Sequence, residues 1–122
     1  MVLELNGYRN FDRELDAFLE QYQIDGILAA EELTTIKAIN FIKKKGLRIP
    51  GDISVIGFTD GQLSQNSDPS LTTISQNANI MGAIALKRLL RQITRKTTKP
   101  QNQNQTIVKH KLILRESTRD FY

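Results

Sequence analysis

The chain has 122 residues, of which 39% are hydrophobic and 25% charged, and its formal net charge is +4. This length allows a single domain with one hydrophobic core, and no apolar run approaches the roughly 20 residues that span a bilayer. The absence of cysteine excludes disulfides and thiolate metal sites. Together with the lack of a signal peptide, it leads us to expect a cytoplasmic protein without a membrane partner.

Positive charge gathers in the last third of the chain. Residues 1–86 carry 7 Lys and Arg against 11 Asp and Glu, whereas residues 87–122 carry 10 against 2. Such asymmetry can mark a nucleic-acid surface, but these cations are spread over a helix, a loop and a strand without interleaved aromatic residues. A solvated basic face is favoured, with Lys87, Arg88, Arg91, Arg95, Lys96 and Lys99 among its members.

The first 45 residues alternate short apolar runs with helical periodicity. Residues 2–5 predict a brief strand, and an apolar stripe from Phe11 to Tyr22 predicts an amphipathic helix. Residues 27–30 predict a buried strand. Residues 32–45 predict a helix that ends in three lysines, and its inward residues are Leu33, Ile36, Ile39 and Ile42.

The next stretch turns the chain from helix to strand and then into a polar loop. Gly46 is placed to end the helix in a left-handed conformation, and residues 50–52 predict a turn. Residues 53–58 predict a strand covered on both faces, followed by a loop over residues 59–70. Because ligands of open α/β sheets gather beyond the carboxyl ends of the strands, this loop is the first candidate for a binding site.

The last part predicts two more strands around one helix. Residues 71–74 and 107–114 are strand candidates, and residues 96–106 form a polar loop. Residues 77–94 predict a helix with more than one apolar face, which is therefore buried on two sides or meets a partner. The alternation predicts an α/β fold with three layers, in which helices flank a mostly parallel sheet.

Catalytic and cofactor motifs are absent from the sequence. There is no phosphate-binding glycine loop, no dinucleotide fingerprint, no zinc-protease motif and no nucleophile elbow. His110, the single histidine, lies between lysines in a predicted strand, where a structural role is favoured. Glu31 and Glu32 are neighbours at a helix start, so they point apart and do not make an acid–base pair. We expect no enzyme, no cofactor and no metal site.

A joint pattern runs through residues 27–60 (ILAAEELTTIKAINFIKKKGLRIPGDISVIGFTD), residues 68–90 (DPSLTTISQNANIMGAIALKRLL) and residues 112–118 (LILREST). It resembles the C-terminal lobe of the effector-binding domain of LacI/GalR-family transcriptional regulators. The resemblance covers about residues 25–118 and implies one lobe of a periplasmic-binding-protein-like type I fold. It also implies that residues 1–122 are a fragment of a longer protein, without its DNA-binding head and N-terminal lobe.

In that family a small effector, often a sugar or a nucleobase, binds between two lobes and controls operator binding by an N-terminal helix-turn-helix. The resemblance implies that this chain is the effector-sensing and dimerisation part. Operator DNA would be contacted only through the domain that these residues do not include. The effector itself is not named by the sequence.

The resemblance also implies an effector site made of Tyr8, Glu31, Thr59 and Asp60. Glu31 stands where the family usually has asparagine, and Thr59 stands where it has an aspartate that often binds the ligand. These departures change which polar groups a pocket would accept and put a conventional sugar effector in doubt. Tyr8 lies near the family's ligand-stacking aromatic residue, and the alternative for it is an exposed loop tyrosine.

Family members form homodimers through the corresponding helix and loop of this lobe. The residues implied here are Ile36, Ile39, Asn40 and Lys43 on the helix, and Leu63, Ser64, Ser67 and Asp68 in the loop. For Ile36 and Ile39 the alternative is packing on the chain's own sheet.

Two other classes of protein stay open. One is a lobe of a periplasmic sugar-binding protein with the same general fold, and the other is an α/β enzyme, which lacks any nucleophile–base pair here. The runs at residues 50–57 and 115–117 favour the regulator.

Overall fold

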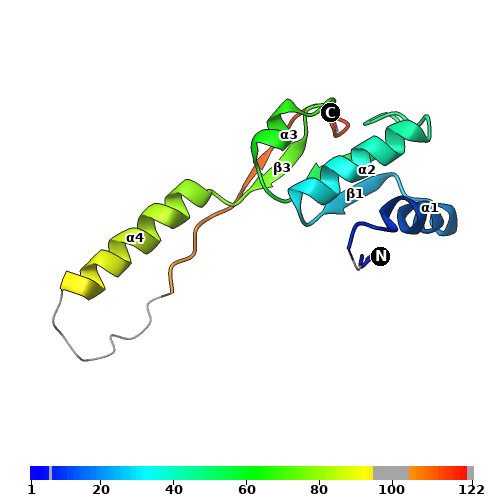
Figure 1. Cartoon of the computed structure of the whole chain (residues 1–122). Coiled ribbons are helices and arrows are strands. Elements are labelled where there is room, and N and C mark those ends of the chain that lie inside the picture. Colours follow the sequence, from blue (N-terminus) through cyan, green and yellow to red (C-terminus); the bar gives the residue numbers. More distant parts are fainter. Residues whose placement is uncertain (6, 95–104, 121–122) are drawn as a thin grey trace.

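The computed structural model of the chain describes residues 1–5, 7–94 and 105–120. Helices and strands alternate along most of it (Figure 1). In chain order the elements are α1 (Phe11–Gln21), β1 (Gly26–Ala29), α2 (Glu32–Lys44), β2 (Ser54–Gly57), α3 (Gln62–Asn66), β3 (Thr72–Ser75), α4 (Ala78–Thr94) and β4 (Lys111–Ile113).

The four strands form one sheet in the order β1-β2-β3-β4. The pairs β1–β2 and β2–β3 are parallel, whereas β4 runs antiparallel to β3. The register sets Ala29 beside Gly57, so β1 and β2 end at the same edge of the sheet. The predicted mixed α/β fold with a mostly parallel sheet is confirmed.

Helices α1 and α2 pack together and cover one face of the sheet. Ile39 and Ile42 of α2 join Val55 and Leu71 in one buried cluster. A second cluster includes Phe11 of α1 and Phe41 of α2. The hydrophobic burial of these side chains is what attaches both helices to the strands. On the opposite face of β1, Leu28 is 63% exposed.

The predicted end of α2 is confirmed at Gly46. Its φ is 74°, a left-handed conformation that glycine adopts without a steric penalty. Its N–H donates to the carbonyl of Lys43, and the N–H of Leu47 donates to the carbonyl of Ile42. Glycine at this point lets the chain leave the helix and turn back toward β2.

Ser117 closes a gap between β2 and β3. The N–H of Val55 donates to the Ser117 carbonyl at 2.8 Å, and the Ser117 N–H donates to the Ser70 carbonyl at 3.0 Å. Its hydroxyl donates to the Val55 carbonyl at 2.6 Å and accepts from the N–H of Thr72 at 2.8 Å. Ser117 is fully buried, so the segment after β4 is a structural part of the sheet.

Helix α4 points away from the sheet (Figure 1). None of its residues is buried, although its sequence is apolar on more than one face. The large apolar side chains that it exposes are Ile80, Met81, Leu86, Leu89, Leu90 and Ile93. Within the part of the chain that the structure describes, burial of this helix on two sides is therefore wrong, and the alternative, a partner that covers it, stays a prediction.

Several predicted elements differ from the structure. Residues 2–5 are not a strand; burial of Leu3 and Leu5 against the cluster around Phe11, and not strand pairing, attaches this segment. The loop over residues 59–70 contains the short helix α3, and the last strand is limited to Lys111–Ile113. Among the helices described here, none has the length and apolar character needed to cross a membrane.

Candidate functional site

The predicted effector residues gather as two pairs at the carboxyl edge of the sheet. Glu31 follows β1 by two residues and Thr59 follows β2 by two. The N–H of Phe58 donates to the Ala29 carbonyl at 3.0 Å, which keeps the two strand ends together. This is the edge at which open α/β sheets bind ligands.

Tyr8 and Glu31 form the first pair. The Tyr8 phenol donates a hydrogen bond to the Glu31 carboxylate, and the Thr34 hydroxyl donates to the same carboxylate oxygen at 2.7 Å. The Lys37 ammonium lies 5.2 Å from the centroid of the Tyr8 ring. Tyr8 is therefore not a free loop residue, although its side chain remains exposed.

The hydrogen bonds from Tyr8 and Thr34 lower the pKa of the Glu31 carboxyl below its usual value. Glu31 also occupies the N-cap position of α2, where the positive end of the helix dipole favours negative charge. An ionised Glu31 can only accept hydrogen bonds, so it would bind a ligand through hydroxyl or N–H groups.

Thr59 has an unusual backbone conformation with a positive φ. Its φ is 145°, which is unusual for a β-branched residue. Its side chain is exposed, while its carbonyl accepts a hydrogen bond from the Ser64 hydroxyl at 3.3 Å. Strained backbone of this kind persists only where the surroundings hold it, and it is often found at ligand sites.

Asp60 points into the protein. Its Oδ1 accepts from the Arg115 guanidinium at 2.7 Å and from the Thr73 hydroxyl at 3.0 Å. The Asp60 and Arg115 side chains are only 15% and 19% exposed. This oxygen therefore holds the loop to β3 and to the segment after β4, and effector contact by Asp60 stays a prediction.

Glu32 connects α2 to α3, and the sequence analysis did not predict this contact. Its Oε1 accepts from the Ser64 N–H at 2.9 Å and from the Ser64 hydroxyl at 2.8 Å, which ties the start of α2 to α3. A Cβ on Gly61 would lie 2.4 Å from the same carboxylate oxygen, so a side chain there would displace the Glu32 carboxylate from its present position. Only the three-dimensional proximity of residues 32 and 64 could have identified this link.

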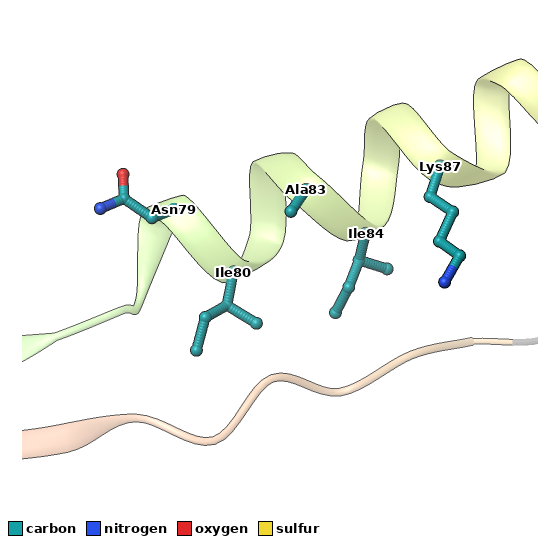
Figure 2. Close-up of a pocket in the computed structure, with 5 residues that line it drawn as sticks. All are labelled: Asn79, Ile80, Ala83, Ile84 and Lys87. Atoms are coloured by element: carbon teal, nitrogen blue, oxygen red, sulfur yellow. The ribbon is translucent and has the colours of Figure 1, made fainter.

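One open cavity of the described structure lies away from these residues. It has a volume of about 420 Å³ and is lined by Asn79, Ile80, Ala83, Ile84 and Lys87 of α4. Figure 2 shows Ile80, Ile84 and Lys87 pointing toward the neighbouring stretch of chain. That stretch is held beside α4 by the Asn77 amide, which donates to the Lys109 carbonyl at 2.7 Å. No predicted effector residue lines this cavity.

The predicted dimer residues divide into exposed and internal ones. Asn40, Lys43 and Leu63 are exposed, and the Lys43 ammonium pairs with the Asp68 carboxylate at 2.6 Å, so α2 and the loop form one continuous surface. Ile36 is half-buried against the chain's own core. Ser67 donates its hydroxyl to the carbonyls of Ser64 and Pro69.

Two of these predicted residues need correction. Ile39 is 2% exposed and belongs to the core cluster under β2, because its position on α2 faces the sheet. Ser64 is fully buried by its hydrogen bonds to Glu32. In this structure neither side chain is available to a partner. Arg95, Lys96 and Lys99 of the predicted basic face lie outside the described residues.

Residues 5–118 match the family described as the periplasmic binding protein-like domain. The chain belongs to this family. Its relatives are bacterial transcriptional regulators of the LacI type and not enzymes. They include the transcriptional repressor PurR of Actinobacillus pleuropneumoniae, which is 38% identical over 109 residues, covering 80% of this chain and 32% of that protein. The ribose operon repressor of Halalkalibacterium halodurans is 34% identical, covering 84% and 30%.

Solved structures of this periplasmic binding protein-like family agree with the fold. The LacI-family regulator of Arthrobacter sp. FB24 in complex with lactose has a TM-score of 0.78 at 30% identity, covering 89% of this chain and 40% of that one. The regulator CelR in complex with cellobiose has a TM-score of 0.75 at 28% identity, covering 87% and 31%. The chain thus spans about a third of the length of such regulators and corresponds to part of their effector-binding domain.

Proposed function

We propose that this chain is the effector-sensing part of a LacI-type transcriptional regulator. The observation that supports the proposal is the Tyr8–Glu31 hydrogen bond beside the paired ends of β1 and β2, in a chain of the periplasmic binding protein-like family. Thr59, two residues after β2, is proposed to complete this site. This role needs binding and a change of shape but no chemical step, so the chain is proposed not to be an enzyme. Its place of action would be the cytoplasm, where operator DNA is found.

The chemistry of this edge favours a neutral, polar ring compound. An ionised Glu31 accepts hydrogen bonds, the Thr59 hydroxyl can donate or accept, and the Tyr8 ring offers an apolar face. A sugar or a nucleobase has this combination of groups. The complexes of two structural neighbours with lactose and cellobiose support the sugar class, and Glu31 and Thr59 would change which sugar groups this edge accepts.

Operator DNA is proposed to be bound by a part of the parent protein that these 122 residues do not contain. The most basic described element, α4, carries Lys87, Arg88 and Arg91 together with six exposed apolar side chains, which is unlike a phosphate-binding surface. Homodimerisation is proposed through the surface of α2 and α3, with Asn40, Lys43 and Leu63 at its centre.

The test uses the full-length parent regulator and calorimetric titration with cellobiose, lactose, ribose and adenine as probes. We expect one of these compounds to bind. Glu31→Ala and Thr59→Ala should then weaken its binding by at least about tenfold, because a hydrogen bond to a charged or buried partner contributes roughly 1.5–3 kcal/mol.

The matched control is Glu20→Ala, an exposed glutamate on the solvent side of α1, which should leave the affinity unchanged. If no probe binds, the sugar and nucleobase classes are wrong. If a probe binds and both site variants bind it as the wild type does, the site lies elsewhere.

A further inference from the structure

Arg115 lies beneath the loop that follows β2, at the end of a long excursion of the chain through α4 and β4. We propose that Arg115 is a positioning residue for this loop, acting through Asp60 to hold Thr59 in its unusual backbone conformation. The link to effector response rests on the proposed function, whereas the link to loop geometry does not.

The guanidinium of Arg115 joins three separate acceptors. Nη2 donates to Asp60 Oδ1 at 2.7 Å, and Nη1 donates to the Leu71 carbonyl at 2.6 Å and to Thr73 Oγ1 at 3.3 Å. The first acceptor belongs to the loop after β2 and the other two to β3 or its start. A planar guanidinium can bridge these groups at once because its N–H donors point in fixed directions.

The backbone of Arg115 is itself held in place. Its N–H donates to the Thr72 hydroxyl at 2.9 Å. The same hydroxyl donates to the Arg115 carbonyl at 3.2 Å. Two residues later, the buried Ser117 is bonded into β2 and β3. The guanidinium therefore projects from a rigid base, which is the requirement for a residue that positions another.

Thr59 needs such support. At a φ of 145° it occupies a region that β-branched residues avoid, and its own side chain is exposed, so no packing of that side chain holds it. Asp60 is the next residue and is anchored on two sides by Arg115 and Thr73. Fixing the residue that follows restricts the backbone of Thr59 in turn.

The ion pair is well suited to this task because it is largely shielded from solvent. With side chains 19% and 15% exposed, neither Arg115 nor Asp60 can be removed without leaving the other charge poorly solvated. The charge of Asp60 thus fixes the position of the loop through Arg115, whereas the side chain of Thr59 is exposed to solvent.

The experiment compares Arg115→Met with Arg119→Met in the 122-residue chain by nuclear magnetic resonance. Arg119 is a matched control, since its guanidinium also binds three acceptors, the carbonyls of Pro50, Gly51 and Asp52. The three-bond amide–Hα coupling of Thr59 reports its φ. We expect Arg115→Met to move this coupling toward the value of ordinary extended backbone and to lower the order parameter of the Thr59 amide. Arg119→Met should change neither.

If Arg115→Met does not fold, Asp60→Asn and Arg115→Lys give the same test with smaller changes in shape. Both should shift the Thr59 coupling in the same direction, and Arg115→Lys should shift it less. An unchanged Thr59 coupling in these variants, or an equal change in Arg119→Met, would overturn the proposal. In the full-length parent, a probe that binds the wild type should bind Arg115→Lys more weakly but Arg119→Lys equally well. The absence of any probe binding there would count against the proposed function and not against the loop geometry.

Discussion

Individual carboxylates join segments of this chain that are far apart in sequence. Asp60 binds Arg115, which lies 55 positions away in the sequence, and Glu32 binds Ser64, which lies 32 positions away. At the opposite end of the sheet, Asp52 acts locally by binding the side chain and the backbone of Arg48. Each carboxylate has a defined partner, so its removal should have a defined consequence.

The lowered pKa of Asp52 predicts that the stability contributed by this carboxylate depends on pH. The hydrogen bonds from Arg48 lower the pKa of Asp52 from 3.8 to about 2. A lowered folded-state pKa contributes stability that is fully present above the unfolded pKa and is lost as the pH falls through about 2. The difference in urea midpoint between the wild type and Asp52→Asn should therefore be larger at about pH 6 than at about pH 2.5.

The control for this measurement is Asp12→Asn, which removes an exposed pair with Lys44 at 3.3 Å. Exposed pairs contribute little, so this variant should have a midpoint close to that of the wild type at both pH values. A difference for Asp52→Asn that is constant between the two pH values would contradict the role of its charge.

The buried hydrogen bonds of the Ser117 hydroxyl predict a large loss of stability in Ser117→Ala. In Ser117→Ala the carbonyl of Val55 and the N–H of Thr72 lose a buried partner. Each unsatisfied group costs roughly 1–3 kcal/mol, so the free energy of unfolding should fall by about 2–6 kcal/mol in urea titration. Ser70→Ala, which removes a hydroxyl bonded to the exposed Glu116, should cost much less. Equal losses in the two variants would show that Ser117 is not a bridge between the strands.

At the scale of whole elements, α2 and α4 have opposite roles. Helix α2 lies at the centre of the core and contributes five buried residues, whereas α4 contributes none. Both helices are apolar, so composition does not distinguish them. Their different burial predicts that similar substitutions will have different effects.

Ile42→Ala and Leu89→Ala test this difference. Ile42 is fully buried, and its truncation should lower the free energy of unfolding by about 2–5 kcal/mol through lost burial and a cavity. Leu89 is 52% exposed, and its truncation should change stability by no more than about 0.5 kcal/mol. A comparable loss in Leu89→Ala would mean that the apolar face of α4 is covered in solution.

At the scale of the whole molecule, the effector edge is open. Its residues are presented on one side only, and Tyr8 and Thr59 are exposed. Because ligand sites bury most of the ligand surface, we expect no submillimolar binding of cellobiose, lactose, ribose or adenine to the isolated chain by calorimetry. A micromolar dissociation constant for any of these compounds would show that this part of the protein is sufficient for recognition.

Self-association is the second property of the whole molecule. We expect a dimer in sedimentation experiments, formed through the α2–α3 surface, and Leu63→Glu should make it monomeric while the circular dichroism is retained. Leu63 is 52% exposed, so the added charge is tolerated in the monomer. The exposed apolar side chains of α4 offer a competing route. Leu89→Glu is the matched control: if it abolishes the dimer and Leu63→Glu does not, the interface is α4.

The sequence alone determined the elements whose signals are local. The apolar stripe from Phe11 predicted α1, and the lysine-rich end with Gly46 predicted the end of α2 to within one residue. The joint pattern of residues 27–118 predicted the family that the comparisons support. The helix predictions depend on periodicity, capping and turn chemistry, which act between near neighbours in the chain, whereas the family rests on resemblance alone.

The tertiary structure alone decided which residues face each other. Leu33 and Ile39 both looked inward on α2, yet Leu33 is 41% exposed and Ile39 is buried, because the sheet covers only part of the helix. The ion pair of Asp60 with Arg115 joins residues 55 positions apart, and no sequence pattern indicated it. Helix α4 was predicted to be buried on two sides or to meet a partner, and the described structure leaves it exposed. Burial and ion pairing depend on distances between segments that only the folded chain brings together, and no local pattern encodes those distances.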